Sequence, residues 1–323
     1  MALLLSEADV RSLLTMPLAL DTVESAFRKL AAGEAQLHTR RRLELPDQAF
    51  LHYMAAADTA DGYMGMKIYT SVRGALRFLV PLYRVRNGEL VALLEADYLG
   101  QMRTGAASGI ATKYMARSNS STVGIVGTGL QARTQLEAVC AVRKIQRVRA
   151  FGRNPEKRAQ FAAEMAAKLG VAVEPARTAE EAVRGADIVI TITTSSRPVV
   201  EGAWLAPGTH INAAGGNFPH KRELDDAAIS RVSRFAADSV EQSRLEAGDL
   251  IQPFASTPAR WDEVLELADI VAGKFPGRSS PDQITLFKSN GIAIEDVAVA
   301  ARVFELATHR QVGTRIPLWE HCG

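Results

Sequence analysis

Hydrophobic and polar positions form different patterns in the two parts of this chain. Near the N-terminus, apolar residues recur at helical spacing over residues 20–30, and Gly33 ends the predicted helix. Over residues 40–94 the apolar runs shorten to strand length, and Asn87-Gly88 predicts a hairpin turn. The first third of the chain is therefore predicted to mix helices and strands.

A regular alternation of strands and helices begins after Ser121. Short apolar segments predict strands, and helical segments such as residues 155–169 lie between them. The predicted strands are residues 122–126, 148–151, 188–193, 210–213 and 235–237. This alternation predicts a parallel sheet with right-handed crossovers. A last helix, from about Ile294, follows the alternating region and is predicted to return to the first domain.

A helix of unusual composition is predicted at residues 103–117, between these two parts. Most of its residues from Gly105 to Ala111 are small. Glycines lower helix propensity, but small side chains let another backbone or a flat ligand approach closely. Tight helix packing is the simpler of these two interpretations.

Composition narrows the class of protein. The chain has 323 residues and a formal charge of +2, which suits two domains or one large one and provides no cation excess for nucleic acid. Its two cysteines, Cys140 and Cys322, cannot form a disulfide framework, and no His/Cys spacing matches a metal site. No targeting or membrane segment is recognisable. We therefore expect a cytoplasmic protein without a metal, a membrane anchor or a nucleic-acid partner.

A glycine-rich segment follows the first strand of the alternating region. Residues 127–132 read Gly-Thr-Gly-Leu-Gln-Ala and lead into a helical stretch, which is the G-x-G-x-x-A pattern of dinucleotide-binding sites. Gly127 permits a tight turn, Gly129 lets the backbone approach a pyrophosphate, and Ala132 keeps the helix close to the strand. The strand before it and the helix after it make a nicotinamide dinucleotide site of the Rossmann type the expected interpretation.

The end of the second strand distinguishes the two forms of the cofactor. A site for NAD places an acid there to bind the ribose 2′-hydroxyl, whereas this chain has Gly152-Arg153-Asn154. A guanidinium binds a 2′-phosphate that a carboxylate would repel. NADP(H) is therefore predicted in preference to NAD(H), unless Arg153 is only a solvated surface residue.

Small and basic residues follow the later strands. Residues 192–195 and 210–217 end two of them, and ligands of parallel sheets bind at the carboxyl ends of strands. His220-Lys221-Arg222 lies just beyond and could neutralise phosphate, although an exposed basic run is an equal alternative.

Four motifs occur in order over nearly the whole chain. They are residues 65–69 (Gly-Met-Lys-Ile-Tyr), 103–108 (Arg-Thr-Gly-Ala-Ala-Ser), 127–132 and 289–296 (Ser-Asn-Gly-Ile-Ala-Ile-Glu-Asp). Together they resemble the ornithine cyclodeaminase/mu-crystallin family. The resemblance implies an α/β fold in which a Rossmann domain with a doubly wound parallel sheet (118–293) accompanies an α+β substrate-binding and dimerisation domain (1–117 with 294–323). It also implies a homodimer that acts on small α-amino or α-imino acids in amino-acid metabolism.

The resemblance assigns roles to individual residues. Lys67, Arg103 and one arginine of the run 40–42, taken as Arg42, are expected to hold the substrate carboxylate, and Asn217 to orient substrate or cofactor. A lysine crowded by an arginine and screened from water is expected to have a lowered pKa, which suits proton exchange with a substrate nitrogen. The expected cofactor contacts are Thr104, Gly127, Gly129, Leu130, Gln131, Arg153, Asn154, Arg158, Thr193, Ser195, Lys221 and Ser289.

One position departs from the cyclodeaminase pattern, in which an aspartate follows the Gly-Gly pair. Here Gly215-Gly216 is followed by Asn217, and an amide cannot accept a proton from the substrate's distal amine. The expected activity is therefore reduction of the C=N bond of an α-imino acid by NADPH, as in ketimine, pyrroline-2-carboxylate or piperideine-2-carboxylate reductases or an alanine dehydrogenase. Two alternatives stay open: ornithine cyclodeamination, and NADPH-gated binding of a small ligand without catalysis, as in mu-crystallin.

Overall fold

The computed structural model describes residues 1–318 and divides into two compact units. Unit 1 comprises residues 1–103 with 291–323, and unit 2 comprises residues 104–290. The division falls earlier in the chain than the expected boundary at 117, because the second half of the small-residue helix packs within unit 2. A Cβ at Gly105 would overlap the backbone of Thr134, and Arg143 donates to the carbonyls of residues 112, 113 and 116.

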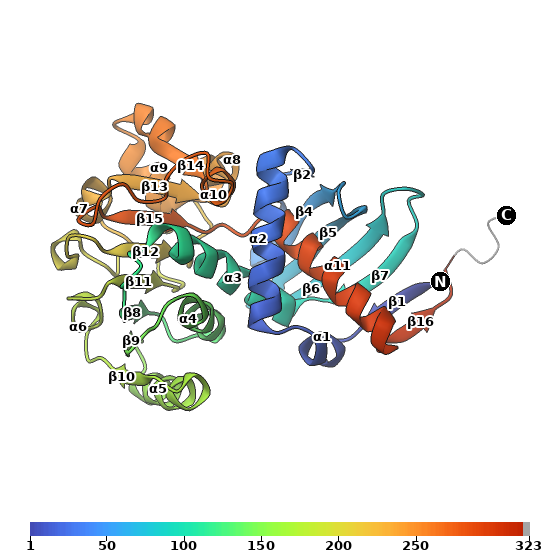
Figure 1. The fold of residues 1–323 in the computed structure, drawn as a ribbon, viewed down its shortest axis with the longest axis horizontal. Coiled ribbons are helices and arrows are strands. Elements are labelled where there is room, and N and C mark those ends of the chain that lie inside the picture. The colour runs from blue at the N-terminus through green and yellow to red at the C-terminus, as the bar shows by residue number, and fades with distance from the viewer. Residues whose placement is uncertain (319–323) are drawn as a thin grey trace. The chain divides into compact units, whose positions relative to one another are not determined.

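Unit 1 is a mixed sheet with two long helices on one face. Its strands are β1 (Ala2–Leu5), β2 (Ala35–Leu37), β3 (Arg41–Leu45), β4 (Ala49–Asp58), β5 (Tyr63–Val72), β6 (Ala75–Arg84), β7 (Leu90–Glu95) and β16 (Thr314–Ile316). They lie in the order β16-β1-β7-β6-β5-β4-β2, with β3 paired to β4. The helices are α1 (Glu7–Leu13), α2 (Met16–Ala32) and α11 (Ala293–Arg310), and α11 packs on α2, β4, β5 and β6 (Figure 1). The predicted return of the last helix to the first domain is confirmed.

Local signals explain how these elements begin and end. Ser6 and Asp9 form a capping box at the start of α1, and Pro17 lies in the first turn of α2. Gly33 ends α2 in the left-handed conformation at φ 76°. The predicted Asn87-Gly88 hairpin joins β6 to β7, which pair antiparallel. The short strand β1 was not predicted, since its few apolar residues pair with β7 and β16 from distant parts of the chain.

Unit 2 has a parallel sheet of the doubly wound type, as predicted. Its strands are β8 (Thr122–Val126), β9 (Arg147–Phe151), β10 (Ala172–Pro175), β11 (Ile188–Thr191), β12 (His210–Ala213), β13 (Arg234–Ala237), β14 (Val264–Glu266) and β15 (Thr285–Lys288). Their order is β10-β9-β8-β11-β12-β15-β13-β14, and every pairing is parallel. The chain runs outward from β8 to β10 and returns to β11 on the other side of β8. The carboxyl ends of β8 and β11 therefore form the switch point where such sheets bind ligands.

Helices connect the strands of unit 2. They are the second half of α3 (Asp97–Met115), then α4 (Leu130–Val142), α5 (Pro155–Leu169), α6 (Ala179–Val183), α7 (Asp226–Arg231), α8 (Val240–Glu246), α9 (Gly248–Phe254) and α10 (Leu267–Val271). Helix α3 begins six residues before its predicted start at Arg103 (103 − 97 = 6). The close approach of Gly105 to Thr134 supports the simpler interpretation of its small residues, which was tight packing.

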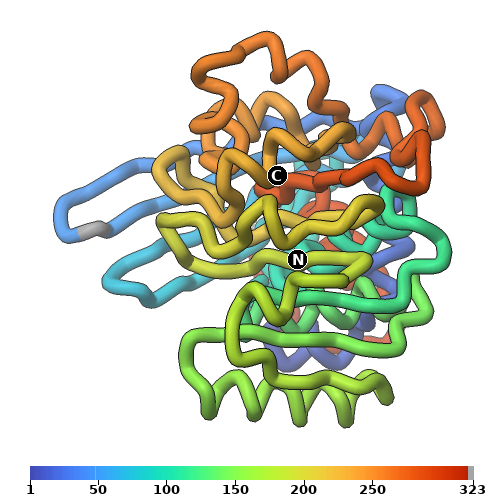
Figure 2. Tube along the Cα trace, turned by 90° about the vertical axis from the view of Figure 1, so that its left-hand side faces the viewer, coloured from blue at the N-terminus to red at the C-terminus, as the bar shows by residue number. Residues whose placement is uncertain are grey.

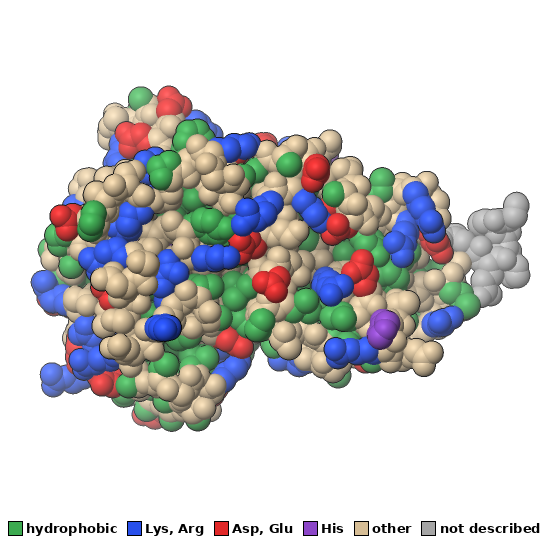
Figure 3. Space-filling view, viewed as in Figure 1, with side chains coloured by type: hydrophobic (Ala, Val, Ile, Leu, Met, Phe, Trp, Pro, Cys, Tyr) green, Lys and Arg blue, Asp and Glu red, His purple; other side chains and the backbone are tan. Residues whose placement is uncertain are grey.

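The surface carries charges of both signs. On the face shown in Figure 3, basic and acidic side chains are interspersed. Within residues 1–318, no helix has both the length and the apolar composition needed to cross a membrane. Cys140 is a free, half-buried thiol, and Cys322 lies outside the described residues.

Candidate functional site

Lys67 and Arg103 share one buried carboxylate oxygen in unit 1. Lys67 Nζ donates to Asp296 Oδ1 at 2.9 Å, and Arg103 Nε donates to the same oxygen at 3.0 Å. Arg103 Nη1 also donates to Glu295 Oε2 at 2.8 Å. Lys67 is 3% exposed and Arg103 5%, while both acids are fully buried. We call Arg40, Lys67, Arg103, Glu295 and Asp296 the Lys67 cluster.

The backbone around α11 is shaped to admit these side chains. Gly291 precedes α11 with φ 75°, and a Cβ there would overlap the Arg103 guanidinium. Gly100 of α3 faces Lys67, where an added Cβ would lie 3.0 Å from Nζ. Glu295 and Asp296 occupy the first turn of α11, where the helix dipole favours negative charge.

Burial changes the ionisation of Lys67. Removal from water, followed by repulsion from Arg103, lowers the pKa of Lys67 to about 8, although Asp296 acts in the opposite direction. The predicted lowering is confirmed. An amine with this pKa can give up or take a proton near neutral pH.

The third basic residue of the cluster is Arg40, which belongs to the run 40–42. Arg40 is 8% exposed, donates from Nη2 to the Gly291 carbonyl at 2.9 Å, and is among the charges that lower the pKa of Lys67. Arg42 lies on β3, half-exposed and opposite His52. Arg40 therefore joins Lys67 and Arg103 in the cluster, and the assignment of Arg42 to the substrate carboxylate stays a prediction.

Aromatic rings on the same face of the sheet border the cluster. Lys67 Nζ lies 5.1 Å from the ring centre of Phe78, which packs 4.9 Å from Tyr69. His52 stacks on Tyr69 at 4.2 Å. Burial, and then the charges of Arg42 and Arg40, lower the pKa of His52 to about 4. His52 is therefore neutral at physiological pH and adds no charge.

The glycine-rich segment of unit 2 has the geometry of a dinucleotide cradle. Gly127 follows β8 with φ 116°, and a Cβ there would overlap the Ile192 carbonyl beyond β11. Gly129 is the N-cap of α4, and its missing Cβ would point into open space. Gly129 has no side chain with which to cap α4, so a ligand phosphate can take that place. These features fit a pyrophosphate at the switch point.

Other expected cofactor residues lie beside this cradle. Leu130 and Gln131 form the first turn of α4, Leu130 being 65% exposed. Thr104 lies against α4, because Gln135 Nε2 donates to its carbonyl at 3.1 Å. Thr104 and the fingerprint are thus brought together within unit 2.

Beyond β9, the structure separates three residues that were expected to act together. Arg153 is exposed and forms no hydrogen bond or ion pair within residues 1–318. Asn154 caps α5 by accepting from the Lys157 amide at 2.8 Å. Arg158 donates to the Gly152 carbonyl at 3.0 Å. Of the three, Arg153 is therefore the one whose side chain has no partner within residues 1–318.

The loops after β11 and β12 are held by one buried acid. Glu223 accepts from the Thr193 amide at 2.6 Å and from the Gly215 amide at 2.9 Å. The Thr193 hydroxyl in turn accepts from the Ser195 amide at 3.1 Å. Glu223 therefore ties together the strand ends that precede Asn217, which is half-buried.

A buried lysine supports the same loop. Lys288 Nζ donates to the Gly216 carbonyl at 2.7 Å and to Asp249 Oδ2 at 2.9 Å. Asp249 Oδ1 accepts from the Glu223 amide at 2.6 Å. Burial, followed by the charge of Asp249, raises the pKa of Glu223. We call Glu223, Asp249 and Lys288 the loop anchor.

Two remaining expected cofactor residues lie at the edges of this region. Lys221 follows the Gly215–Asn217 loop, with Nζ 4.9 Å from the Phe218 ring centre. Ser289 is 3% exposed, and its amide donates to the Ala213 carbonyl at 3.1 Å. The assignment of both residues to the cofactor stays a prediction.

The sequence did not predict the roles of the acids in the Lys67 cluster and in the loop anchor. Glu295 and Asp296 belong to a recognised motif, but acids in the first turn of a helix are also ordinary dipole partners. The loop anchor has no local signal, because its members come from separate elements. Within residues 1–318, no group of three or more His, Cys, Asp or Glu side chains is arranged to hold a metal ion.

Known proteins share this architecture. The model of the ornithine cyclodeaminase/mu-crystallin family matches residues 1–311. The chain belongs to this family. A Delta(1)-pyrroline-2-carboxylate reductase of Bacillus cereus is 39% identical over 261 residues, 78% of this chain and 80% of the relative.

Two solved structures of family members have the same fold. The Delta(1)-pyrroline-2-carboxylate reductase of Thermococcus litoralis, in complex with NADH and L-proline, is 38% identical with a TM-score of 0.93, covering 97% of this chain and 100% of that one. An archaeal alanine dehydrogenase dimer with bound NAD is 35% identical with a TM-score of 0.93, covering 98% and 99%. The resemblance and fold class predicted from the sequence are confirmed.

Proposed function

We propose that this chain is an oxidoreductase that reduces the C=N bond of a small α-imino acid. The observation that carries the proposal is the set of three buried cations in the Lys67 cluster. Arg40, Lys67 and Arg103 meet in one part of unit 1, and each is at most 8% exposed. Guanidinium and ammonium groups brought together in this way suit the carboxylate of an α-imino acid. The names of the relatives, a pyrroline-2-carboxylate reductase and an alanine dehydrogenase, support the same substrate class.

Each residue of the Lys67 cluster has its own role in this reaction. Arg103 and Arg40 present guanidinium groups, which bind a carboxylate through two hydrogen bonds. Lys67, with its pKa of about 8, donates a proton to the imine nitrogen as the carbon is reduced. Asp296 holds Lys67 and Arg103 in position on one oxygen. The C=N bond thereby gains one hydride at carbon and one proton at nitrogen.

A nicotinamide dinucleotide supplies the hydride when it is bound at the Gly127–Ala132 cradle. We propose that NADP(H) is preferred, because Arg153 stands where an acid would select NAD and has no partner within residues 1–318. NADH and NAD in the two solved relatives support the dinucleotide class only.

Replacing Arg153 by Asp tests the cofactor preference. We expect kcat/KM with NADPH to fall by roughly 10- to 100-fold, the effect of one charge-assisted hydrogen bond, while the value with NADH is unchanged or higher. Steady-state rates with both cofactors measure the ratio. The control Arg177→Asp changes the same charge at another exposed position in unit 2. A wild-type enzyme that already prefers NADH would contradict the proposal.

The pKa of Lys67 predicts a falling pH profile. Below about pH 8 Lys67 is protonated and can both bind the carboxylate and donate its proton; above that pH both functions are lost. We expect kcat/KM for imine reduction to decrease about tenfold per pH unit above 8. In Lys67→Arg, which stays charged, a lower rate without this falling limb is expected. The same limb in both enzymes would assign the titration to another group.

A substrate panel tests the reaction itself. NADPH and NADH oxidation is followed with Δ1-pyrroline-2-carboxylate, Δ1-piperideine-2-carboxylate and pyruvate plus ammonia, and products are identified by mass. We expect the corresponding amino acids. Formation of proline and ammonia from ornithine without net cofactor oxidation would instead establish a cyclodeaminase despite Asn217. Ligand binding without hydride transfer would support a non-catalytic, mu-crystallin-like role.

We further propose that the protein forms a homodimer through the strands of unit 1. Large apolar side chains are exposed near two hairpins, β3–β4 and β5–β6, which run side by side (Figure 2). They are Leu43 (54% exposed), Leu45 (56%) and Leu79 (40%), which the strand register places on one face of the sheet, and Leu76 (47%), which lies on the opposite face. The three leucines that share a face are candidates for an interface. The dimeric state of the archaeal alanine dehydrogenase supports this assembly, and sedimentation equilibrium tests it.

A further inference from the structure

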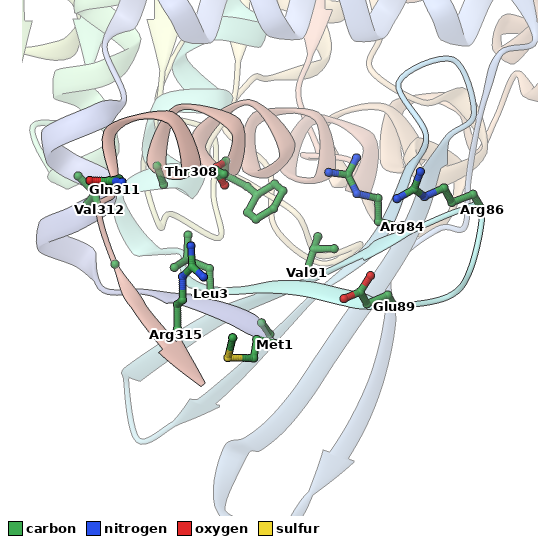
Figure 4. Close-up of a pocket in the computed structure, with 14 residues that line it drawn as sticks. Met1, Leu3, Arg84, Arg86, Glu89, Val91, Thr308, Gln311, Val312 and Arg315 are labelled. Carbon is green, nitrogen blue, oxygen red and sulfur yellow. The ribbon is translucent and has the colours of Figure 1, made fainter. Parts of the chain in front are cut away.

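A cavity lies at the other end of α11 from the acids of the Lys67 cluster. It has a volume of about 540 Å³ and is enclosed by β1, β6, β7, β16 and the last turns of α11 (Figure 4). This volume is typical of sites for small molecules. No member of the Lys67 cluster lines it. Nothing in the proposed reaction uses it.

Basic side chains surround this cavity. Arg84 and Arg86 lie on one side with their guanidinium groups pointing the same way, and Arg315 lies on the other (Figure 4). Glu89 is the acid among the lining residues, which leaves an excess of two positive charges. Within residues 1–318, the side chains of Arg86 and Arg315 form no hydrogen bond or ion pair. The cavity therefore attracts an anion.

The floor of the cavity is apolar and partly pre-organised. Val91 is 7% exposed, and Phe304 of α11 lies beside it in the lining. The Arg84 guanidinium is 4.8 Å from the ring centre of Tyr63 and 5.8 Å from that of Phe304. These contacts hold Arg84 in place, and its guanidinium has no carboxylate partner among residues 1–318. A ligand that fits has an acidic group and an apolar body.

We propose that this cavity is a second binding site, specific for a small organic acid. Its carboxylate binds Arg84 and Arg86, whose planar guanidinium groups match the two carboxylate oxygens. Its apolar part covers Phe304 and Val91. The site is independent of the proposed function, because none of its residues takes part in the reaction.

Calorimetric titration with phenylacetate tests the proposal. The full chain carrying Lys67→Met is titrated, so that carboxylate binding at the Lys67 cluster does not contribute. We expect one phenylacetate per chain, and an affinity reduced about tenfold or more by adding Arg86→Gln and Arg315→Gln. The control Arg77→Gln removes an exposed β6 arginine outside the cavity and leaves the affinity unchanged.

Two further measurements keep the result unambiguous. Thr308→Trp, an exposed lining position, fills the cavity from α11 and is expected to abolish binding without altering the melting temperature. Inorganic phosphate lacks an apolar body and is expected to bind at least about tenfold more weakly than phenylacetate. Binding that survives the arginine substitutions, or equal affinity for phosphate, would show an adventitious ion only and overturn the proposal.

Discussion

Replacing Lys67 by Met is expected to lower kcat/KM for imine reduction by about 10³-fold. A charge-assisted hydrogen bond to the substrate carboxylate contributes about 2 kcal/mol, and a positioned proton donor contributes roughly 10²-fold or more. Both are lost together, because one ammonium group supplies them. The fold should survive, since Asp296 keeps its hydrogen bond from Arg103 at 3.0 Å. Steady-state kinetics and a thermal melt measure the two effects.

Two companion variants separate these contributions. Lys67→Arg retains the charge but is a poor proton donor, so its KM should stay within a few-fold of the wild-type value while kcat falls. Lys113→Met removes an exposed lysine of α3 and should change neither parameter. If Lys67→Met kept its full kcat/KM, the Lys67 cluster would not be the substrate site.

Local sequence signals predicted five of the eight strands of unit 2, and β10, β14 and β15 were not predicted. The strand at Thr122–Val126, the glycines after it and the capped helices each depend on neighbours within a few residues. The positive φ of Gly127 is a local backbone requirement, whereas the Ile192 carbonyl that leaves no room for a Cβ there comes from just beyond a distant strand. Short-range patterns were sufficient to predict the dinucleotide cradle, although long-range packing also shapes it.

Long-range packing explains what the residues alone could not predict. Lys67 lies between the apolar residues Met66 and Ile68 along a strand, and this alternation indicates a solvent-facing lysine as readily as a buried one. Its burial comes from Asp296, which lies 229 positions away in the chain. From the sequence, only the resemblance to a family identified Lys67 as a residue of the site.

The choice between Arg40 and Arg42 shows a second limit. The two residues are separated by two positions, so strand periodicity assigns both to one face of the sheet. Arg40 precedes the first residue of β3, Arg41, and reaches the Gly291 carbonyl before α11. That contact depends on how the C-terminal helix returns to the sheet, which periodicity cannot specify.

The loop anchor of unit 2 shows the same limit and predicts a large effect on stability. Lys288 and Asp249 are both fully buried, and their side chains meet at 2.9 Å. In Lys288→Met, Asp249 and Glu223 are left as neighbouring buried acids without a cation. Breaking a buried pair from one side costs about 3–5 kcal/mol. For a protein of this size we expect the melting temperature to fall by roughly 10 °C.

The second partner of the pair supplies the decisive control. Adding Asp249→Asn to Lys288→Met removes the uncompensated charge, so the double variant should regain part of the lost stability. Additive losses would mean that the two side chains act independently, and a melting temperature within about 2 °C of wild type in Lys288→Met would contradict the buried pair. Because Lys288 also holds the Gly216 carbonyl, the double variant should bind NADPH more weakly than wild type even where its stability is recovered. A double variant that is folded but has reduced affinity for NADPH would show that the loop anchor positions the loop before Asn217, in addition to stabilising the fold.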